Sequence, residues 1–174
     1  MSGTSIGEEN KSRTSNTETR SWRQRTPLGY YGRWELEEEE AWTTAFTDGS
    51  GLDNKAAGGF CSNLTRPAHQ PNLSGERYLG TRATHIDGEL EGIALALEAH
   101  NKKNTAMLAI LSDCRPAIRV TEKLDSGTEG PRSSIEARIQ GALETRENNQ
   151  LETYITWVKG HKDIKGNEIA DKLS

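Results

Sequence analysis

The order of strand-like and helix-like segments after residue 41 restricts the fold of this chain more than any other feature. Stretches rich in β-branched, aromatic and aliphatic residues predict strands at about 43–48, 55–64, 77–83, 107–111 and 154–158. Capping residues and apolar residues three or four positions apart predict helices at about 88–100, 116–124, 133–146 and 167–173. Short links join the first three strands, as in an antiparallel meander. The last two strands are each reached through helices and should run parallel to the first.

Such an order predicts an α/β domain on a five-stranded mixed sheet, with three antiparallel strands, two parallel strands and flanking helices. The apolar run Met107–Leu111 is typical of a strand covered on both faces, and 154–158 is expected to be another buried strand. A stretch rich in Pro, Asn and Gly predicts a loop over 65–75. The carboxyl ends of the parallel strands should share one edge, where open α/β sheets tend to bind ligands.

The clearest predicted helix is the one over 88–100. Asp87 is the expected N-cap residue, and Glu89 falls in the first turn. One apolar stripe at positions i, i+3, i+4 and i+7 is formed by Leu90, Ile93, Ala94 and Leu97. The stripe indicates that this helix packs against the sheet, and Glu89 lies next to it.

The first forty residues differ in composition from the rest. Residues 1–20 contain one Ile among polar and charged residues, which predicts disorder. In residues 20–34 arginines alternate with Trp and Tyr, a pattern suited either to stacking on nucleic-acid bases or to a linker whose aromatic residues dock on the domain. An acidic run follows at 35–40. We therefore expect a disordered or linker extension over 1–40 and one folded domain over 41–174.

The net charge of −4 and the pI of about 5.6 argue against a protein that holds nucleic acid through bulk positive charge. They leave open a protein that uses a few contacts and metal ions. The two cysteines, Cys61 and Cys114, and the lack of a secretion signal predict an intracellular protein of the nucleus or cytoplasm. No apolar run approaches the roughly 20 residues of a membrane span, so no membrane partner is expected.

Four carboxylates are predicted to converge. Asp48 ends the first strand, within the stretch from Thr43 to Gly51, and Asp113 follows the fourth. Glu89 lies on the helix that packs on the sheet, and Asp171 lies one turn into the final helix. Four carboxylates that close need cations between them, and hard oxygen ligands select Mg²⁺ or Mn²⁺. Two such ions about 4 Å apart would suit displacement at a phosphodiester.

Each of these residues also has a plainer interpretation. Asp48 with the following Gly-Ser is ordinary turn chemistry, and Glu89 suits the positive end of a helix dipole. Asp113 could cap the next helix, and Asp171 could pair with a lysine in solvent. His161, ten residues before Asp171, could transfer protons at the site or simply be exposed. The joint pattern favours the metal site.

Four segments in this order make the chain resemble type 1 ribonuclease H, and most closely the domains attached to reverse transcriptases of non-LTR retrotransposons. They are Thr47–Ser50, Gly88–Leu97, Leu111–Asp113, and Thr156–His161 with Gly166–Asp171. The resemblance implies Mg²⁺-dependent cleavage of the RNA strand of RNA–DNA hybrids, with a reverse transcriptase domain as a possible partner. It implies metal binding by Asp48, Glu89, Asp113 and Asp171, proton transfer or product release by His161, and substrate contacts by Gly49, Ser50, Ser112 and Asn167.

The chain departs from that family's pattern in three places. Thr84-His85-Ile86 stands where relatives often offer Asn or Gln to the minor groove, no basic insertion lies between 125 and 135, and the final helix is short. Three rival functions follow: a domain of this fold that only binds nucleic acid, a nuclease or transposase-like enzyme acting on DNA, and an interaction domain whose charges are solvated.

Overall fold

The computed structural model describes residues 42–52, 55–65, 70–160 and 164–174. The expected extension over 1–40 and His161 lie outside these residues. One five-stranded sheet has the order β3-β2-β1-β4-β5, in which β2 pairs antiparallel with β1 and β3, while β4 pairs parallel with β1 and β5. The strands are β1 Thr43–Leu52, β2 Lys55–Thr65, β3 Gln70–Thr81, β4 Met107–Ser112 and β5 Glu152–Trp157. The predicted α/β fold with its mixed sheet is confirmed.

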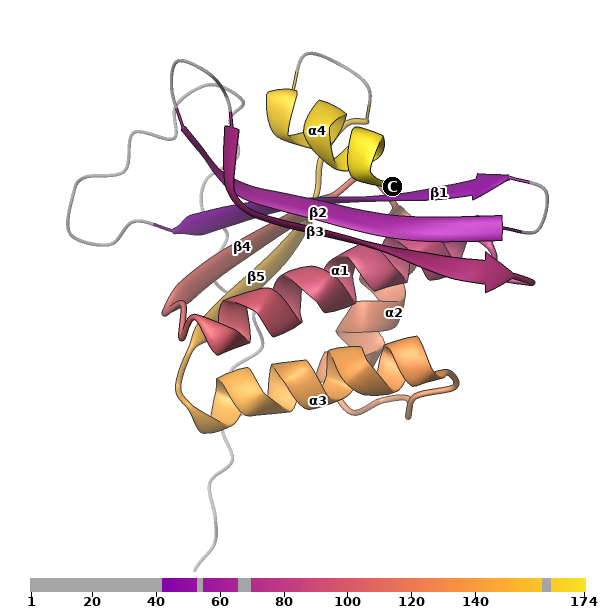
Figure 1. Ribbon diagram of the computed structural model, residues 1–174. Helices are drawn as coiled ribbons and strands as arrows, with labels where there is room; N and C mark the ends of the chain where they lie inside the picture. The colour runs from indigo at the N-terminus through magenta and orange to yellow at the C-terminus, as the bar shows by residue number, and fades with distance from the viewer. Residues whose placement is uncertain (1–41, 53–54, 66–69, 161–163) are drawn as a thin grey trace, which may run out of the picture.

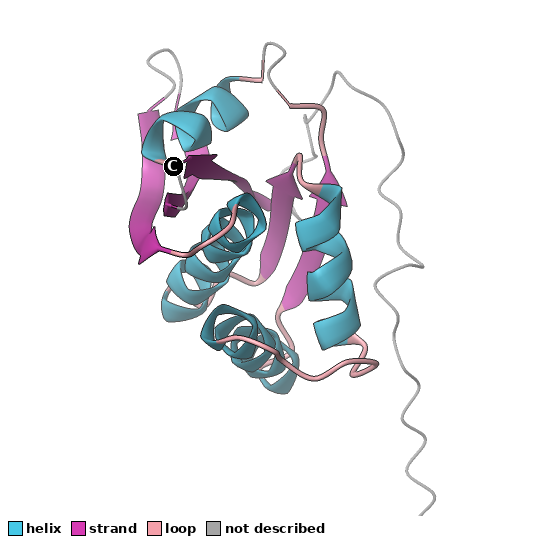
Figure 2. Ribbon diagram, turned by 90° about the vertical axis from the view of Figure 1, so that its right-hand side faces the viewer, coloured by secondary structure: helices cyan, strands magenta, loops and turns pink. Residues whose placement is uncertain are grey.

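The helices cover the two faces of the sheet unequally. Their bounds are α1 His85–Lys102, α2 Arg115–Asp125, α3 Ser134–Asn148 and α4 Lys165–Leu173. Figure 1 shows α4 on one face, across β1 and β2, and α1 and α3 on the other. Figure 2 shows α1 and α3 as neighbours, with α2 beside them. In the described part of the chain, no helix combines the length and apolar character of a membrane span.

The main core lies between α1 and the sheet. The predicted stripe of α1 is buried against the sheet, mostly against β1 and β2, in one core cluster with β4, whose central residues are buried as expected for a strand covered on both faces. The buried residues that the stripe and β4 contribute to this cluster are Leu90, Ile93, Ala94, Leu97, Leu108 and Ile110. Burial of each leucine or isoleucine in this set contributes about 1.5–3 kcal/mol, so this packing fixes the position of α1, which carries Glu89.

The structure corrects two predicted strand boundaries. β1 does not end at Asp48 but continues to Leu52, because Gly49, Ser50 and Gly51 pair with β2 instead of forming a turn. The predicted loop over 65–75 is also wrong, since β3 begins at Gln70 and pairs along β2. β3 is an edge strand, where Pro and Gly are tolerated because one side of the backbone needs no ladder partner.

Two further expectations were wrong in detail. Thr84, not Asp87, caps α1: the Thr84 side chain accepts a hydrogen bond from the Asp87 backbone N–H, and the Asp87 carboxylate accepts one from the Thr84 N–H. This reciprocal capping starts the helix three residues early. β5, expected to be buried, is half-buried in its four central residues and exposed at both ends, since it is the other edge of the sheet.

A buried histidine should make stability depend on pH. His100 is 1% exposed and bonded to Thr105 Oγ1 and Ser62 Oγ, and burial, with a smaller effect of Arg146, lowers the pKa of His100 from 6.5 to about 4. Between these values the unfolded chain binds a proton that the folded protein does not. The free energy of unfolding should therefore fall as pH falls from 6.5 to 4, by at most about 3 kcal/mol.

Urea unfolding of the metal-free protein at several pH values measures this loss. His100→Gln is the comparison, because glutamine keeps a polar side chain but does not titrate. Its stability should fall less over the same range, and an equal slope in both proteins would contradict the assignment.

Candidate metal centre

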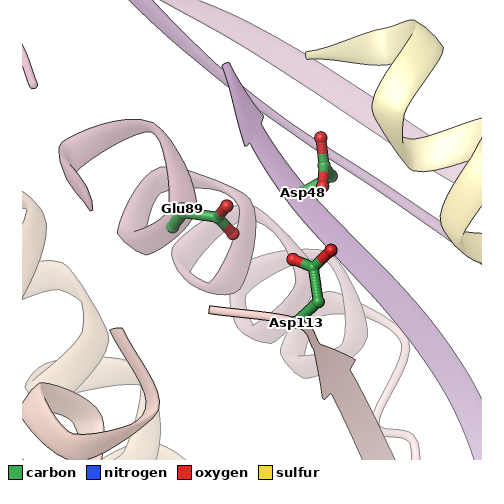
Figure 3. Close-up of side chains that lie close together, drawn as sticks. All are labelled: Asp48, Glu89 and Asp113. Carbon is green, nitrogen blue, oxygen red and sulfur yellow. The ribbon is translucent and has the colours of Figure 1, made fainter. Parts of the chain in front are cut away.

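Three carboxylates from three different elements meet at one edge of the sheet. Asp48 lies within β1, Glu89 is the fifth residue of α1, and Asp113 directly follows β4. Each offers an oxygen, and these oxygens all lie within 4.8 Å of one another. Figure 3 shows the three side chains pointing toward a common point. The parallel pairing of Thr47 with Ser112 explains the meeting of Asp48 and Asp113, since each follows one partner of that pair.

A row of glycines lets α1 approach the sheet closely enough to bring Glu89 to the site. A Cβ on Gly49 would lie 2.1 Å from the Glu89 backbone N and 2.4 Å from the Gly88 carbonyl carbon. A Cβ on Gly58 would lie 2.3 Å from the Gly88 carbonyl oxygen. Only hydrogen fits at these positions, so helix and strand backbones touch directly.

The site is electrostatically unfavourable without a cation. Glu89 is 1% exposed and Asp48 is 5% exposed, and Glu89 Oε2 is buried with no hydrogen-bond partner. Burial, with Asp48 and Asp113 adding repulsion, raises the pKa of Glu89 to about 9, although a backbone hydrogen bond from Gly49 opposes the rise. An unsatisfied buried oxygen beside two further carboxylates is a donor set that fits hard divalent ions.

Asp171 belongs to the same cleft but stands apart from the other three carboxylates. The cleft, of about 290 Å³, is lined by Asp48, Gly49, Ser50, Gly51, His85, Glu89, Asp113 and Asp171. Asp171 is exposed on α4 and is not among the three residues whose oxygens lie within 4.8 Å. α4 is held there by Ser174, whose hydroxyl donates to Asp48 Oδ2 at 2.9 Å and whose carbonyl oxygen accepts from Ser50 Oγ at 2.6 Å.

The RNase H family model matches residues 40–174 of this chain. The chain belongs to the RNase H family. Among solved structures, it is similar to RNase H1 of the archaeon Halobacterium salinarum, with 22% identity and a TM-score of 0.53 over 75% of this chain and 92% of that one. It is also similar to the N-terminal RNase H domain of a Mycobacterium tuberculosis protein, solved as a fusion with maltose-binding protein.

That second match has 19% identity and a TM-score of 0.54, over 76% of this chain and 89% of the other. Both likenesses show a shared fold. No curated protein matches this chain.

Of the four residues expected to contact substrate in this RNase H domain, two line the cleft and two are buried. Gly49 and Ser50 line the cleft. Ser112 and Asn167 are buried, at 0% and 2% exposed: the Ser112 hydroxyl accepts a hydrogen bond from the Cys114 N–H, and Asn167 Oδ1 has no partner. Their substrate contacts remain predictions, as does the role of His161, which lies outside the described residues.

Two residues at the site were not predicted. His85 lines the cleft with Nε2 3.3 Å from Glu89 Oε1, and its spacing of four residues from Glu89 was the available signal. Trp157 donates from Nε1 to the Asp113 carbonyl oxygen at 3.0 Å, and the Arg115 guanidinium stacks 4.3 Å above its ring. Trp157 thus anchors the backbone of Asp113. Nothing in the sequence around Trp157 indicated this contact.

Proposed function

We propose that this RNase H domain hydrolyses the RNA strand of RNA–DNA hybrids with the help of two divalent ions. The observation that supports it is the group of Asp48, Glu89 and Asp113, with a buried, unpartnered Glu89 oxygen, on the fold of this family. Mg²⁺ is the ion we propose, with Mn²⁺ as a substitute, since carboxylate oxygens suit both.

The proposed role of each residue follows from the strand or helix that carries it. Asp48 is fixed within the central part of the sheet, which makes it the best candidate to contact both ions. Glu89 and Asp113 would hold them from two sides, and Asp171 would complete the set from α4. The ions, when bound, would stabilise the attacking and leaving oxygens of the phosphodiester.

The cleft wall at Gly49 and Ser50 is where we propose that the RNA strand approaches. Gly49 has no side chain, and Ser50 is exposed. A 2′-hydroxyl donates and accepts hydrogen bonds, and so distinguishes RNA from DNA at such a surface.

We further propose that the domain derives from a non-LTR retrotransposon, works beside a reverse transcriptase domain, and acts in the nucleus or cytoplasm. The motif around Asp171 supports the retrotransposon origin and the reverse transcriptase partner, and the two free cysteines, Cys61 and Cys114, support the location.

The test is incubation with a labelled RNA–DNA hybrid and Mg²⁺, beside single-stranded RNA and duplex DNA. We expect cleavage of the hybrid only, and loss of about a hundredfold or more in rate for Asp48→Asn. An intact hybrid, or equal cutting by Asp48→Asn, would refute the proposed activity.

One observation favours a second candidate, a domain that binds hybrid without cutting it. Asp171 lies outside the group of three carboxylates whose oxygens are within 4.8 Å of one another, so the proposed fourth ligand is not gathered with the other three. Fluorescence anisotropy with the same hybrid separates the two candidates. Tight binding without cleavage, at any Mg²⁺ or Mn²⁺ concentration, would select the second.

A further inference from the structure

We propose that His85 and Glu89 form a nitrogen–oxygen binding site for a divalent transition ion of the Zn²⁺ type. This site lies at the cleft but differs in metal preference from the all-carboxylate centre. The inference shares Glu89 with the proposed function, yet it concerns ion binding and needs no nucleic acid.

The geometry of the pair suits one shared ion. His85 and Glu89 are four residues apart on α1, so their side chains lie on the same helix face. His85 Nε2 and Glu89 Oε1 are 3.3 Å apart. Two ligands bound tetrahedrally to one zinc ion at about 2.0–2.2 Å each are separated by about 3.4 Å. The donors therefore already have the spacing that a common ion requires.

Glu89 can serve such an ion and still face the other carboxylates. Oε1 is directed at His85, whereas Oε2 is buried and has no partner. The groups that face Glu89 from neighbouring elements are Asp48 of β1 and Asp113 after β4, either of which offers a further oxygen. A third ligand would come from one of these two carboxylates, whose oxygens lie within 4.8 Å of a Glu89 oxygen.

His85 is fixed at the backbone and open at the ring. A Cβ on Gly51 would lie 2.8 Å from the His85 Cα, which shows how tightly β1 holds the start of α1. The His85 side chain is nevertheless 59% exposed and lines the cleft. An ion can reach the imidazole from solvent, and small rotations of the ring can adjust its distance to Glu89.

The ligand chemistry sets the metal preference. Imidazole binds Zn²⁺, Co²⁺ and Cu²⁺ well, whereas Mg²⁺ prefers oxygen ligands and keeps several waters. Loss of the His85 nitrogen should therefore weaken transition-ion binding and have little effect on Mg²⁺ binding. An ion bound by Glu89 and His85 would also compete with Mg²⁺ for Glu89.

The experiment measures ion binding to the full chain without nucleic acid. Calorimetry with Zn²⁺ and Mg²⁺, and electron paramagnetic resonance of bound Cu²⁺, are applied to the parent, His85→Asn and His85→Gln. We expect Zn²⁺ affinity to fall about tenfold or more in both variants, and the nitrogen hyperfine signal of Cu²⁺ to be lost, with Mg²⁺ affinity within about twofold of the parent. Circular dichroism checks that both variants are folded.

Two other histidine variants locate the nitrogen donor. His69→Asn makes the same chemical change at a histidine that has no role in the proposal, and it should bind Zn²⁺ like the parent. If His161→Asn removes the nitrogen signal and His85→Asn keeps it, the proposal is overturned. It is also overturned if both His85 variants bind Zn²⁺ as tightly as the parent.

The two proposals can fail separately. A protein that leaves hybrid intact but loses Zn²⁺ affinity in the His85 variants would refute the function and keep the ion site. A protein that cuts hybrid with Mg²⁺ but shows no dependence of Zn²⁺ binding on His85 would do the reverse.

Discussion

Glu89→Gln is expected to stop hybrid cleavage and, in the absence of metal, to make the same protein more stable. Glu89 is 1% exposed, one of its oxygens has no partner, and two other carboxylates lie near it. A neutral amide of the same shape removes the desolvation and repulsion that raise the pKa of Glu89, and its NH₂ can donate to Asp48 or Asp113. We expect a gain of about 1–3 kcal/mol at pH 7 with a chelator present, and a loss in cleavage rate of about a hundredfold or more.

Thermal unfolding in EDTA and in Mg²⁺ measures the first effect. Mg²⁺ should raise the melting temperature of the parent more than that of Glu89→Gln, because a ligand stabilises only the state that binds it. Glu98→Gln is the matched control, since it makes the same change on the same helix. Glu98 is paired with Arg138 and its pKa is lowered, so this variant should lose stability and keep its Mg²⁺ response. If Glu89→Gln is destabilised like Glu98→Gln, burial of Glu89 and its repulsion by Asp48 and Asp113 do not lower the stability of the folded protein.

The parts of the fold that local periodicity controls could be predicted from the sequence. The apolar residues of α1 recur at helical spacing, and β4 is one short continuous apolar run. The helix and the buried strand that these two patterns predict are both found. The extension of β1 through Gly49–Gly51 could not be predicted in this way. Those residues have turn composition, and they remain in a strand because they pair with β2. The backbone of α1, which is far away in sequence, packs directly on Gly49 and Gly51.

The candidate site shows the same division. That Asp48 and Asp113 lie close together could be predicted from topology alone. Their strands run parallel, and each residue directly follows one partner of the last pair, Thr47 and Ser112. Asp171 lines the cleft, but its distance from the other carboxylates depends on how α4 packs on β1 and β2, which the sequence does not indicate. The contact of Trp157 with the Asp113 carbonyl joins residues 44 positions apart and has no sequence signature.

Gly49→Ala is expected to separate α1 from β1 and to cost about 3 kcal/mol or more of stability. The added methyl would lie 2.1–2.7 Å from the Gly88 and Glu89 backbone, and backbone atoms cannot move aside as a flexible side chain can. Relief of that clash requires a shift of the turn of α1 that carries Glu89. Cleavage should therefore be lost even in molecules that remain folded, and Mg²⁺ binding should weaken in parallel.

Gly141→Ala is the control, because Gly141 is exposed within α3 and has open space where a Cβ would be. That variant should gain about 0.5–1 kcal/mol and cut normally, since alanine favours a helix over glycine. Urea unfolding and the hybrid assay measure both proteins. If Gly49→Ala is as stable and active as Gly141→Ala, close backbone contact is not what places Glu89. If it fails as expected, the glycine beside Asp48 serves the metal centre by bringing a helix within reach of a strand, a role different from the turn that its sequence context suggests.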